Sequence, residues 1–453
     1  MIRTAFLCLL ALLLAGPVTA WGQTPASASS DPSGEMLSLE QAITLALQHN
    51  RLIKNDQLEV EKTAERVEIA RTRRIPQFDL DFLGLQTITP IEFRFDRGSL
   101  GLLPGGSPFP LQDVRIGSSR APNALLTARV TQPLTQLHRI GLGVKLQETG
   151  RELAESKLEA QRLAITNQVK RGYYAVLQTE SALVAIEESA KLHRELDRVV
   201  GEYVVQKVAL TSDSLEVKTS LASDEYEATK LRNALTSQKE QLNLLLGRDV
   251  RTTFNVVPAI ETTFAEFDLA AAQQRAVEQR TEIKEARLKM KQAELARRIK
   301  KAERVPEVSL TLGYFSPLGV AVVPHNVAAA GVSVKWEPFD WGRKKRELAE
   351  AQKTIAQADN TLREAEAQVL LDVNGRFRKL QEARSLLKVT QAAQASAQEK
   401  LRVETNKFKL EAALFKDVLQ TQAAVVAAKQ QQQQAVLAFL TARADFERAV
   451  GEQ

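Results

Sequence analysis

The feature that most constrains the fold of this chain is that it carries one pattern twice. When the sequence is compared with itself at a shift of 230 positions, similar residues fall together at Leu39 and Leu269, Ala42 and Ala272, Ile53 and Ile283, Leu58 and Leu288, Pro76 and Pro306, and Leu80 and Leu310. At a shift of 204 the later parts match at Asp213 and Asp417, Leu221 and Val425, and Leu235 and Phe439. Such a repeat predicts two copies of one structural unit.

The second alignment also predicts that each copy contains a very long helix. Apolar residues recur every seven positions at Val169, Val176, Leu183 and Ala190, and their counterparts are Val373, Leu380, Leu387 and Gln394. Sustained seven-residue spacing is typical of coiled coils. The 61 basic and 55 acidic residues are interspersed along the chain, which is typical of solvated helix faces and does not suggest nucleic-acid binding.

In both copies the pattern changes from helical to alternating at a proline. Pro76 stands in RIPQFDLDF, and Pro306 stands in RVPEVSLTLGYF. Proline removes a helical hydrogen bond and biases the preceding residue away from the helix, but its missing N–H is tolerated at the start of a strand. We therefore predict helix-to-strand junctions at Pro76 and Pro306, and we predict that the returning strands end near Pro133 and Pro338.

Each copy is accordingly predicted to run helix, strand, loop, strand, very long helix, turn, helix. The predicted elements are residues 39–74, 77–88, 123–133, 137–206 and 213–246 in the first copy, and 268–304, 307–317, 327–337, 343–408 and 415–450 in the second. Pro76 and Pro133 are 57 positions apart, but Pro306 and Pro338 are only 32 apart. The first copy therefore has about 25 additional residues, rich in Gly, Pro and Ser, which predict a long loop.

The predicted strands are amphipathic and about ten residues long. In one of them, Leu126, Ala128 and Val130 alternate with Thr127, Arg129 and Thr131. This pattern suits a tilted strand that crosses a bilayer, but it also suits a small soluble sheet packed on one face. Four strands cannot close a barrel, and open edges are not tolerated in lipid, so a membrane assignment requires several copies. Helices about 100 Å long favour a protein that spans a distance, such as the gap between two bacterial membranes.

The N-terminus predicts export. Arg3 precedes the apolar run AFLCLLALLLAG, and a small-residue site ends at Ala20, so residues 1–20 are predicted to be a secretory signal peptide. The alternative is a membrane anchor, but the apolar run is too short to span comfortably. The only cysteine, Cys8, lies in this segment, so we expect no disulfide and no cysteine-based metal site in the exported chain.

The sequence resembles the TolC-like outer-membrane efflux protein family over essentially all of the exported chain. The resemblance is carried by LSLEQAITLALQHN, by the junctions RIPQ and RVPE, by WEPFDWGRKKRELAEAQ after the fourth strand, by FKLEAALFKDVLQTQAAV at the second hairpin turn, and by the repeat itself. One departure is that Cys8 lies within the apolar run, so it cannot be the acylated N-terminal cysteine that many relatives carry.

This resemblance implies a mainly α fold with a small β part and an internal twofold repeat. In a homotrimer, long antiparallel coiled-coil helical hairpins would form a trimeric α-barrel, joined to a 12-stranded transmembrane β-barrel with four strands per protomer. It also implies a place in the outer-membrane lipid of a Gram-negative bacterium, with the helices extending into the periplasm. The implied partners are a periplasmic adaptor (membrane fusion) protein and an inner-membrane transporter.

The expected function is an outer-membrane channel that passively exports small molecules (drugs, toxic compounds or metals) or secreted polypeptides. The alternative is a periplasmic coiled-coil scaffold or adaptor protein that does not enter the membrane. No nucleophile–base pair, metal-ligand spacing or phosphate-binding glycine loop occurs, so we expect neither an enzyme nor a cofactor or metal. The expected domains are the signal peptide 1–20, an N-terminal extension 21–38, a first repeat 39–247, a linker 248–267 and a second repeat 268–453.

The resemblance places a periplasmic entrance at the hairpin turns and makes Asp417, Gln420 and Asp213 its candidate lining residues. Relatives often have an Asp-Val-Leu-Asp run here, but this chain has Gln420 in place of the last acid. Ala413 falls where some relatives have a basic residue that helps to hold the entrance closed. Alternatively, Asp213 and Asp417 are helix caps, and Asp213 forms a capping box with Glu216.

Residues near the end of the fourth strand are candidate anchors at the membrane interface. Trp336 and Trp341 flank this end, and Arg343 and Lys344 follow. Aromatic side chains collect at membrane–water interfaces, and each cation can gain about 1 kcal/mol from anionic headgroups. Ordinary turn packing and solvated helix ends are the alternative explanations. Further basic groups lie at Arg71, Arg73 and Arg74, and at Arg297, Arg298, Lys300, Lys301 and Arg304.

Overall fold

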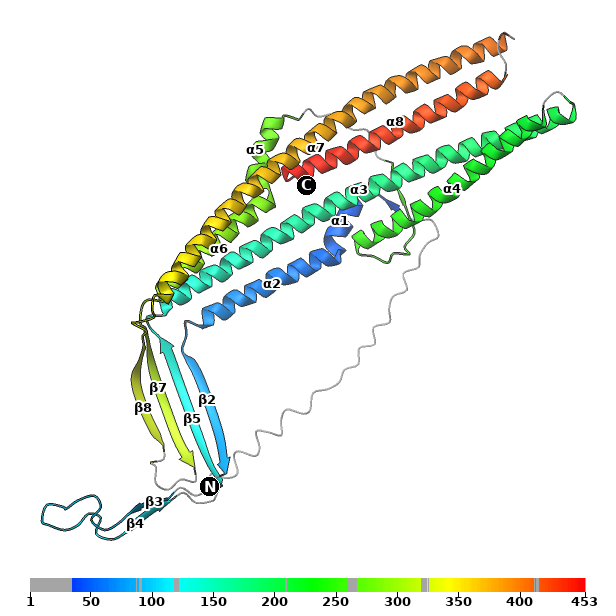
Figure 1. The fold of residues 1–453 in the computed structure, drawn as a ribbon. Coiled ribbons are helices and arrows are strands. Elements are labelled where there is room, and N and C mark those ends of the chain that lie inside the picture. Colours follow the sequence, from blue (N-terminus) through cyan, green and yellow to red (C-terminus); the bar gives the residue numbers. More distant parts are fainter. Residues whose placement is uncertain are drawn as a thin grey trace.

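The computed structural model describes residues 35–452 except 87, 89–91, 118–121, 208–209, 259–266, 319–323, 325, 411 and 413–414. The predicted signal peptide and most of the predicted extension 21–38 therefore lie outside the described residues. Figure 1 shows an elongated molecule with a β-sheet at one end and two long helical hairpins leading away from it. The fold is mainly α with a small β part, as the sequence predicts.

The two repeats have the same order of elements. The first contains α1 (Leu39–His49), α2 (Arg51–Thr72), β2 (Gln77–Gln86), β5 (Pro122–Pro133), α3 (Leu137–Val205) and α4 (Thr211–Leu246). The second contains α5 (Leu269–Gln279), α6 (Thr281–Ala302), β7 (Glu307–Leu318), β8 (Val327–Lys335), α7 (Arg343–Lys409) and α8 (Phe415–Val450). The shared order confirms the predicted internal repeat.

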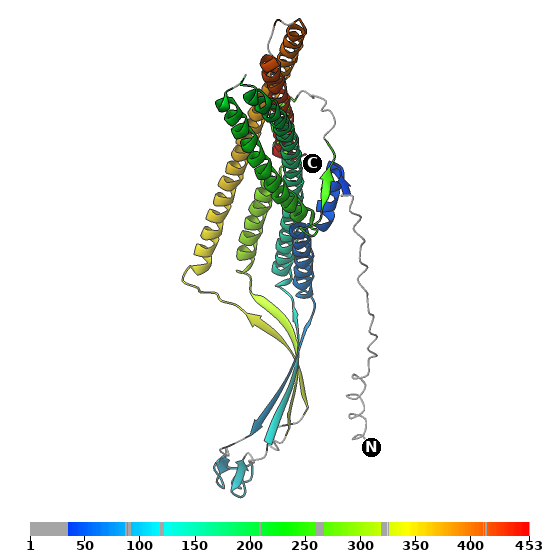
Figure 2. The same ribbon diagram turned by 90° about the vertical axis from the view of Figure 1, so that its right-hand side faces the viewer.

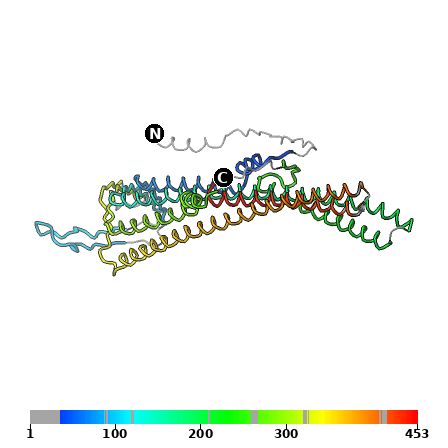
Figure 3. Tube along the Cα trace, turned by 90° about the horizontal axis from the view of Figure 1, so that it is seen from above, coloured from blue at the N-terminus to red at the C-terminus, as the bar shows by residue number. Residues whose placement is uncertain are grey.

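Four short strands form two small sheets that the sequence analysis did not predict. Strand β1 (Glu35–Leu37) pairs in parallel with β6 (Phe254–Val256), and the Tyr173 hydroxyl lies 3.0 Å from the Leu37 carbonyl oxygen beside them. Strand β3 (Glu92–Phe95) pairs antiparallel with β4 (Val114–Gly117). The additional residues of the first copy thus contain a two-stranded ribbon, which projects beyond the end of the main sheet (Figures 1 and 3).

The main sheet and the helices continue one another in the same lateral order. The antiparallel strands follow the order β2-β5-β7-β8, and the helices attached to them pack in the order α2, α3, α6, α7. Farther from the sheet, α4 packs against α3, α3 against α8, and α8 against α7. The helices therefore form one curved layer that extends the sheet, and Figure 2 shows this layer with the strongly twisted strands below it.

The structure corrects the prediction of one helix over residues 39–74 and one over 268–304. Each is divided in two by a residue with extended backbone, Asn50 (φ −61°, ψ 128°) and Arg280 (φ −61°, ψ 130°). The Asn50 side chain accepts hydrogen bonds from the Leu52 and Ile53 amides, as a favourable N-cap does. The Arg280 side chain makes no capping hydrogen bond to the helix that follows it. N-capping therefore does not explain the helix break at Arg280.

The predicted seven-residue seam is confirmed by burial. Val169, Val176, Ala190, Val373, Leu380 and Leu387 are all buried. Val169, Val176, Val373 and Leu380 belong to two cores that lie midway along the long helices, where α1 and α5 and the ends of α4 and α8 pack. None of the helices in the described ranges carries an apolar stretch of the length that crossing a membrane requires.

Candidate functional site

The main sheet has one apolar face and one polar face. The register places Phe78, Val130, Leu312 and Ala330 in one row across the four strands. Asp79 and Arg129 form the neighbouring pair, and in a strand successive side chains point to opposite faces. The predicted alternation therefore extends across the four strands near the helices, with polar and charged groups on one side, whereas Leu83 and Leu125 pair on this same side toward the far end of the sheet.

The apolar face is uncovered in a single chain. Phe78 is 66% exposed, Phe82 is 69% exposed and Val332 is 64% exposed. The strands of this sheet pack chiefly against one another, and β2 and β8 are its two outer strands. An exposed apolar area of this kind marks an interaction surface for lipid or protein. A soluble sheet packed on one face, the alternative considered from the sequence, is not what the described chain forms.

The four junction prolines lie where helices and strands meet. Pro76 lies directly before β2, and Pro306 lies directly before β7. Pro133 is the last residue of β5, and Pro338 lies three residues after the end of β8. Thr135 connects the junction at Pro133 to the junction at Pro306. Its hydroxyl donates to the Pro306 carbonyl (2.7 Å) and accepts from the amide of Val308 (2.8 Å).

At the end of β8, the candidate anchors form one exposed group. Trp336 is 60% exposed and Trp341 is 91% exposed. Phe339, which the sequence analysis did not single out, packs edge-on against Trp341 with 4.8 Å between ring centroids. Trp341 has φ +54° and Gly342 has φ +83°, so the backbone turns sharply here and holds the indole outward.

The candidate cations beside these rings are already paired. Arg343 donates to the Glu337 carboxylate at 2.5 Å and to the Glu347 carboxylate at 2.9 Å. Lys344 donates to the carbonyl oxygen of Glu337 at 3.1 Å. Any contact with a lipid headgroup would therefore compete with these carboxylates.

At the first hairpin turn, the structure shows how Asp213 is used within the chain. Helix α4 begins at Thr211, so Asp213 is its third residue, and its carboxylate accepts a hydrogen bond from the Leu210 amide at 3.2 Å. The predicted capping box between Asp213 and Glu216 is wrong, because the helix starts two residues earlier than the prediction assumed. The carboxylate still lies at the tip of the hairpin.

At the second hairpin turn, Asp417 lies in the first turn of α8 and is half-buried, whereas Gln420 is exposed. The carbonyl oxygen of Asp417 accepts a hydrogen bond from the Thr421 hydroxyl at 2.6 Å. Ala413, where the sequence departs from relatives, lies outside the described residues. Asp213 and Asp417 occupy equivalent positions of the two repeats, each near the start of the returning helix.

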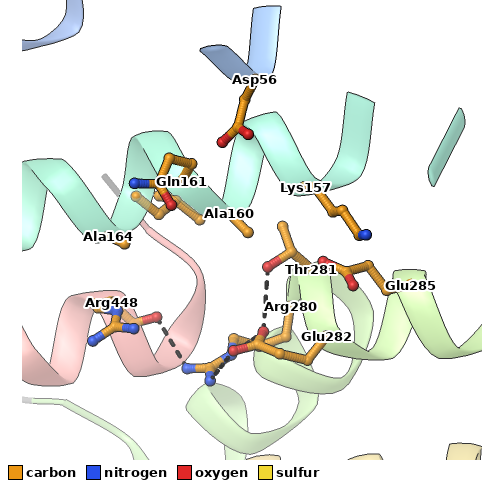
Figure 4. Close-up of a pocket in the computed structure, with 11 residues that line it drawn as sticks. Asp56, Lys157, Ala160, Gln161, Ala164, Arg280, Thr281, Glu282, Glu285 and Arg448 are labelled. Atoms are coloured by element: carbon orange, nitrogen blue, oxygen red, sulfur yellow. Dashed lines mark hydrogen bonds and ion pairs between the residues drawn. The ribbon is translucent and has the colours of Figure 1, made fainter. Parts of the chain in front are cut away.

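Midway along the molecule, Arg280 forms a polar joint that the sequence analysis did not predict. Its guanidinium donates to both oxygens of Glu282 (2.9 and 2.7 Å), to Asp372 (3.2 Å), and to the carbonyl oxygens of Arg448 (3.2 Å) and Ala449 (3.1 Å) at the end of α8. Figure 4 shows the guanidinium pointing toward the α8 end and Glu282. Arginine has no preference for helix starts, so no sequence signal marked this residue.

A polar cavity of about 450 Å³ lies beside this joint, and Asp56, Lys157 and Glu285 line it (Figure 4). Burial raises the pKa of the Glu285 carboxyl. Burial also opposes ionisation of Glu282, but the charge of Arg280 and its hydrogen bonds outweigh burial and hold the pKa of Glu282 below its ordinary value of 4.5. Acids and bases are mixed in this cavity, so it shows no preference for one sign of ligand.

Within the described residues, no three His, Cys, Asp or Glu side chains are grouped so that they could hold a metal ion. The polar groups described above are instead distributed from the sheet to the hairpin tips.

Comparison with known proteins identifies the family. The model of the family described as "Outer membrane efflux protein" matches residues 42–248 and 272–452, one match for each repeat. No curated protein sequence is significantly similar to the chain.

Several solved structures share the fold. The CmeC outer membrane channel of Campylobacter jejuni is 14% identical, with a TM-score of 0.73, over 97% of this chain and 93% of that one. The outer membrane protein VceC of Vibrio cholerae is 16% identical, with a TM-score of 0.68, over 91% and 96%. The open state of the MtrE outer membrane channel of Neisseria gonorrhoeae is 17% identical, with a TM-score of 0.69, over 91% and 89%. With its sheet of two faces, its helical hairpins and a family match that covers both repeats, this chain belongs to the outer membrane efflux protein family.

Proposed function

We propose that three copies of this chain form one outer-membrane channel for export. The sheet carries the proposal, because its apolar face is exposed, its polar face is aligned across four strands, and its outer strands β2 and β8 have open edges. Lipid does not tolerate open edges, so β8 of one copy is expected to pair with β2 of the next. Three copies, the number that the family resemblance implies, supply twelve strands.

The helices would continue this barrel as a tunnel into the periplasm. They follow the lateral order of the strands in a single layer, so closing the sheet also closes the helical layer. Helices α3 and α7 contain 69 and 67 residues and are each about 100 Å long. The apolar residues Val205, Leu210 and Leu410 are strongly exposed at the hairpin tips, where a protein partner can cover them.

We propose that an inner-membrane transporter delivers the cargo through a periplasmic adaptor protein, and that the channel itself is passive and not an enzyme. The cargo class is small molecules or secreted polypeptides. A periplasmic scaffold that stays out of the membrane is the alternative, but the exposed apolar face of the sheet disfavours it, because a scaffold would have no use for such a face.

Individual residues have proposed roles within this channel. Asp417, Gln420 and Asp213 would line the periplasmic entrance. Trp336, Trp341, Arg343 and Lys344 would lie at the periplasmic membrane interface. Pro76, Pro133, Pro306 and Pro338 would mark the depth at which the tunnel becomes a barrel.

The proposed division of the chain follows the repeat. Residues 1–20 would be the signal peptide, 21–38 an extension, 39–247 the first repeat, 248–267 a linker and 268–453 the second repeat. The two separate family matches support this division. The pairing of β1 with β6 joins the extension to the linker, so these two segments would act as one small unit.

The proposal can be tested by fractionation and native mass measurement. The full-length protein should be found in the outer-membrane fraction, be extracted only by detergent, and have the mass of a trimer. The purified trimer should conduct ions in a planar bilayer. A soluble periplasmic monomer would rule the proposal out in favour of the scaffold.

A further inference from the structure

A second cavity lies where the helices meet the sheet. Its volume is about 870 Å³, within the range of pockets for organic ligands, and residues of α2, α3, α6 and the sheet line it. The sheet residues in its wall are Gln77, Thr131, Pro133 and Ser309. Gln77 pairs with Thr131, and Pro133 pairs with Ser309, so all four lie on the polar face. If the proposed function holds, this face lines the lumen, and the cavity opens onto the path of the cargo.

Arginines dominate the charge of this cavity. Arg66, Arg73 and Arg139 line it. Arg139 is paired with Glu307 at 2.6 Å, and Arg66 lies 3.5 Å from Glu59. Arg73 has no ion pair with any residue that the structure describes. Helix α3 starts at the cavity with its positive end, α2 ends there with its negative end, and these dipoles oppose one another. The side chains therefore determine the net charge of the cavity. This charge is positive, which favours binding of an anion.

One polar atom in the cavity wall is unsatisfied. Gln136 has its Nε2 3.3 Å from the Ser309 hydroxyl, but its Oε1 is buried and has no hydrogen-bond partner. A buried polar atom without a partner is costly, so a rotation of the Gln136 side chain toward the cavity would be favoured by a ligand with a complementary group. Turning the amide round would exchange an unsatisfied acceptor for an unsatisfied donor, and a polar position would remain either way.

Apart from Gln147, the remaining wall is apolar and leaves room. Ile69, Ile140, Leu146 and Ile299 face the cavity together with Gly143. A Cβ added at Gly143 would meet no heavy atom within 4 Å. A flat or bulky apolar group can therefore lie against α3 while a charged group reaches the arginines.

We propose that this cavity is a binding site for amphipathic organic anions: molecules with an acidic head group, an apolar body and a hydrogen-bonding group. This inference rests on the proposed function, because it makes such anions a class of cargo that pauses at the junction of tunnel and barrel. Binding must be weak enough for release, as in any conduit.

Equilibrium dialysis with the purified full-length protein tests the site whether or not the protein conducts. The probe is 4-amino-1-naphthalenesulfonate, and the matched cation is 1-naphthylmethylammonium. The anion should bind and the cation should not compete. Arg73→Gln removes one charge-assisted hydrogen bond and should weaken binding about tenfold. Gly143→Leu fills the cavity and should weaken binding at least as much.

Arg71→Gln is the matched control, because Arg71 lies on the same turn of α2 but is paired with Glu68 and Glu148 outside the cavity. It should change binding less than twofold. Equal effects of Arg71→Gln and Arg73→Gln, or no binding of the anion, would overturn the site. Gly143→Ala places a smaller side chain in the cavity, and it replaces Gly143→Leu in the test if the leucine variant does not fold. Normal binding by a protein that shows no conductance would instead refute the proposed channel and the luminal role.

Discussion

At the residue scale, Asn50 and Arg280 occupy equivalent positions of the two repeats and bind equivalent atoms with different chemistry. The Asn50 amide donates to the Leu245 carbonyl oxygen at 2.8 Å. The Arg280 guanidinium donates to the carbonyl oxygen of Ala449, the counterpart of Leu245 at the shift of 204. The carbonyl end of a helix carries partial negative charge, so a buried cation there is favourable. Each residue thus breaks one helix and binds the end of another.

Arg280→Ala should destabilise the protein strongly. It leaves the α8 carbonyl groups, Glu282 and Asp372 without their shared donor, in a joint where the arginine side chain is only 10% exposed. The partly exposed carboxylates of Glu282 and Asp372 contribute little, but the α8 carbonyl groups lose a buried charged donor, which costs about 1–3 kcal/mol. The measurement is thermal or urea unfolding of the purified protein.

Arg275→Ala is the matched control for Arg280→Ala. Arg275 lies five residues away and pairs with Glu452, but both side chains are nearly half exposed. Exposed pairs contribute about 0–1 kcal/mol. Equal losses in the two variants would show that the Arg280 joint has no special role in stability.

The lowered pKa of Glu282 predicts a specific dependence of stability on pH. A carboxyl whose pKa is lowered in the folded state contributes stability above its unfolded pKa, and this contribution is lost as the pH falls through the lowered value. Glu282→Gln should therefore lower the melting temperature at pH 7 and lose less on acidification below about pH 4.5 than the wild-type protein does.

Glu285→Gln should behave in the opposite sense. Burial raises the pKa of Glu285, so its ionised form destabilises the fold as the pH rises through that value. The glutamine variant should be more stable than the wild type at pH 7, and this gain should shrink at acidic pH. The same trend in both variants would contradict the assignment of these shifts to Arg280 and to burial.

At the scale of elements, two glycines let helices end beside the breaks. Gly247 follows α4 with φ +73°, and its counterpart Gly451 follows α8 with φ +93°. A Cβ at Gly247 would lie 2.2 Å from the backbone oxygen of His49, and one at Gly451 would lie 3.3 Å from the Gln279 Cβ. The α4 end therefore approaches the backbone of the broken helix more closely than any other residue type allows, whereas the α8 end makes a tight contact only with the Gln279 side chain.

Gly247→Ala should destabilise the protein by at least about 1–3 kcal/mol, because alanine is strained at positive φ and must also displace the His49 backbone. Gly201→Ala is the control. Gly201 lies inside α3, and a Cβ there meets no heavy atom within 4 Å, so alanine should stabilise by about 0.5–1 kcal/mol. Unfolding of both variants checks the contrast, and a neutral Gly247→Ala would contradict the predicted clash.

The elements that the sequence predicted are those with a strong periodic signal. The long helices, the four main strands and the proline junctions follow from spacing and from the missing proline N–H. The helix breaks were missed because apolar spacing continues through them, and Arg280 has no capping preference. Strands β1 and β6 are three residues each, and their paired residues Glu35 and Phe254 are 219 positions apart in the chain, so no local pattern reveals their pairing.

The cavity between the helices and the sheet could not be predicted from the sequence for a related reason. Arg66 and Arg139 come from separate helices, and their approach depends on α2 packing against α3. The basic group at Arg71, Arg73 and Arg74 was visible in the sequence as a cluster. Only the structure separates Arg73, which faces the cavity, from Arg71, which is paired with acids.

At the scale of the whole molecule, we propose that charge at the far end of the hairpins selects what the tunnel admits. Asp417 and Asp213 each stand in the first turn of a returning helix, about 100 Å from the sheet. In the proposed trimer, three copies of Asp417 would form a ring of negative charge around a narrow opening. Such a ring concentrates cations, whereas a residue that only supports its helix start affects stability alone.

Asp417→Asn distinguishes these roles, because asparagine keeps a hydrogen-bond acceptor but removes the charge. We expect the preference for cations over anions in a planar bilayer to fall, while the melting temperature barely changes, since the lost dipole interaction is only about 0.3–1 kcal/mol. Asp213→Asn removes the other carboxylate proposed for the entrance, so it should also lower the preference for cations, and it deprives the Leu210 amide of its charged acceptor. Unchanged selectivity with a lowered melting temperature would mean that Asp417 only stabilises the start of α8, and that the opening is lined by other groups.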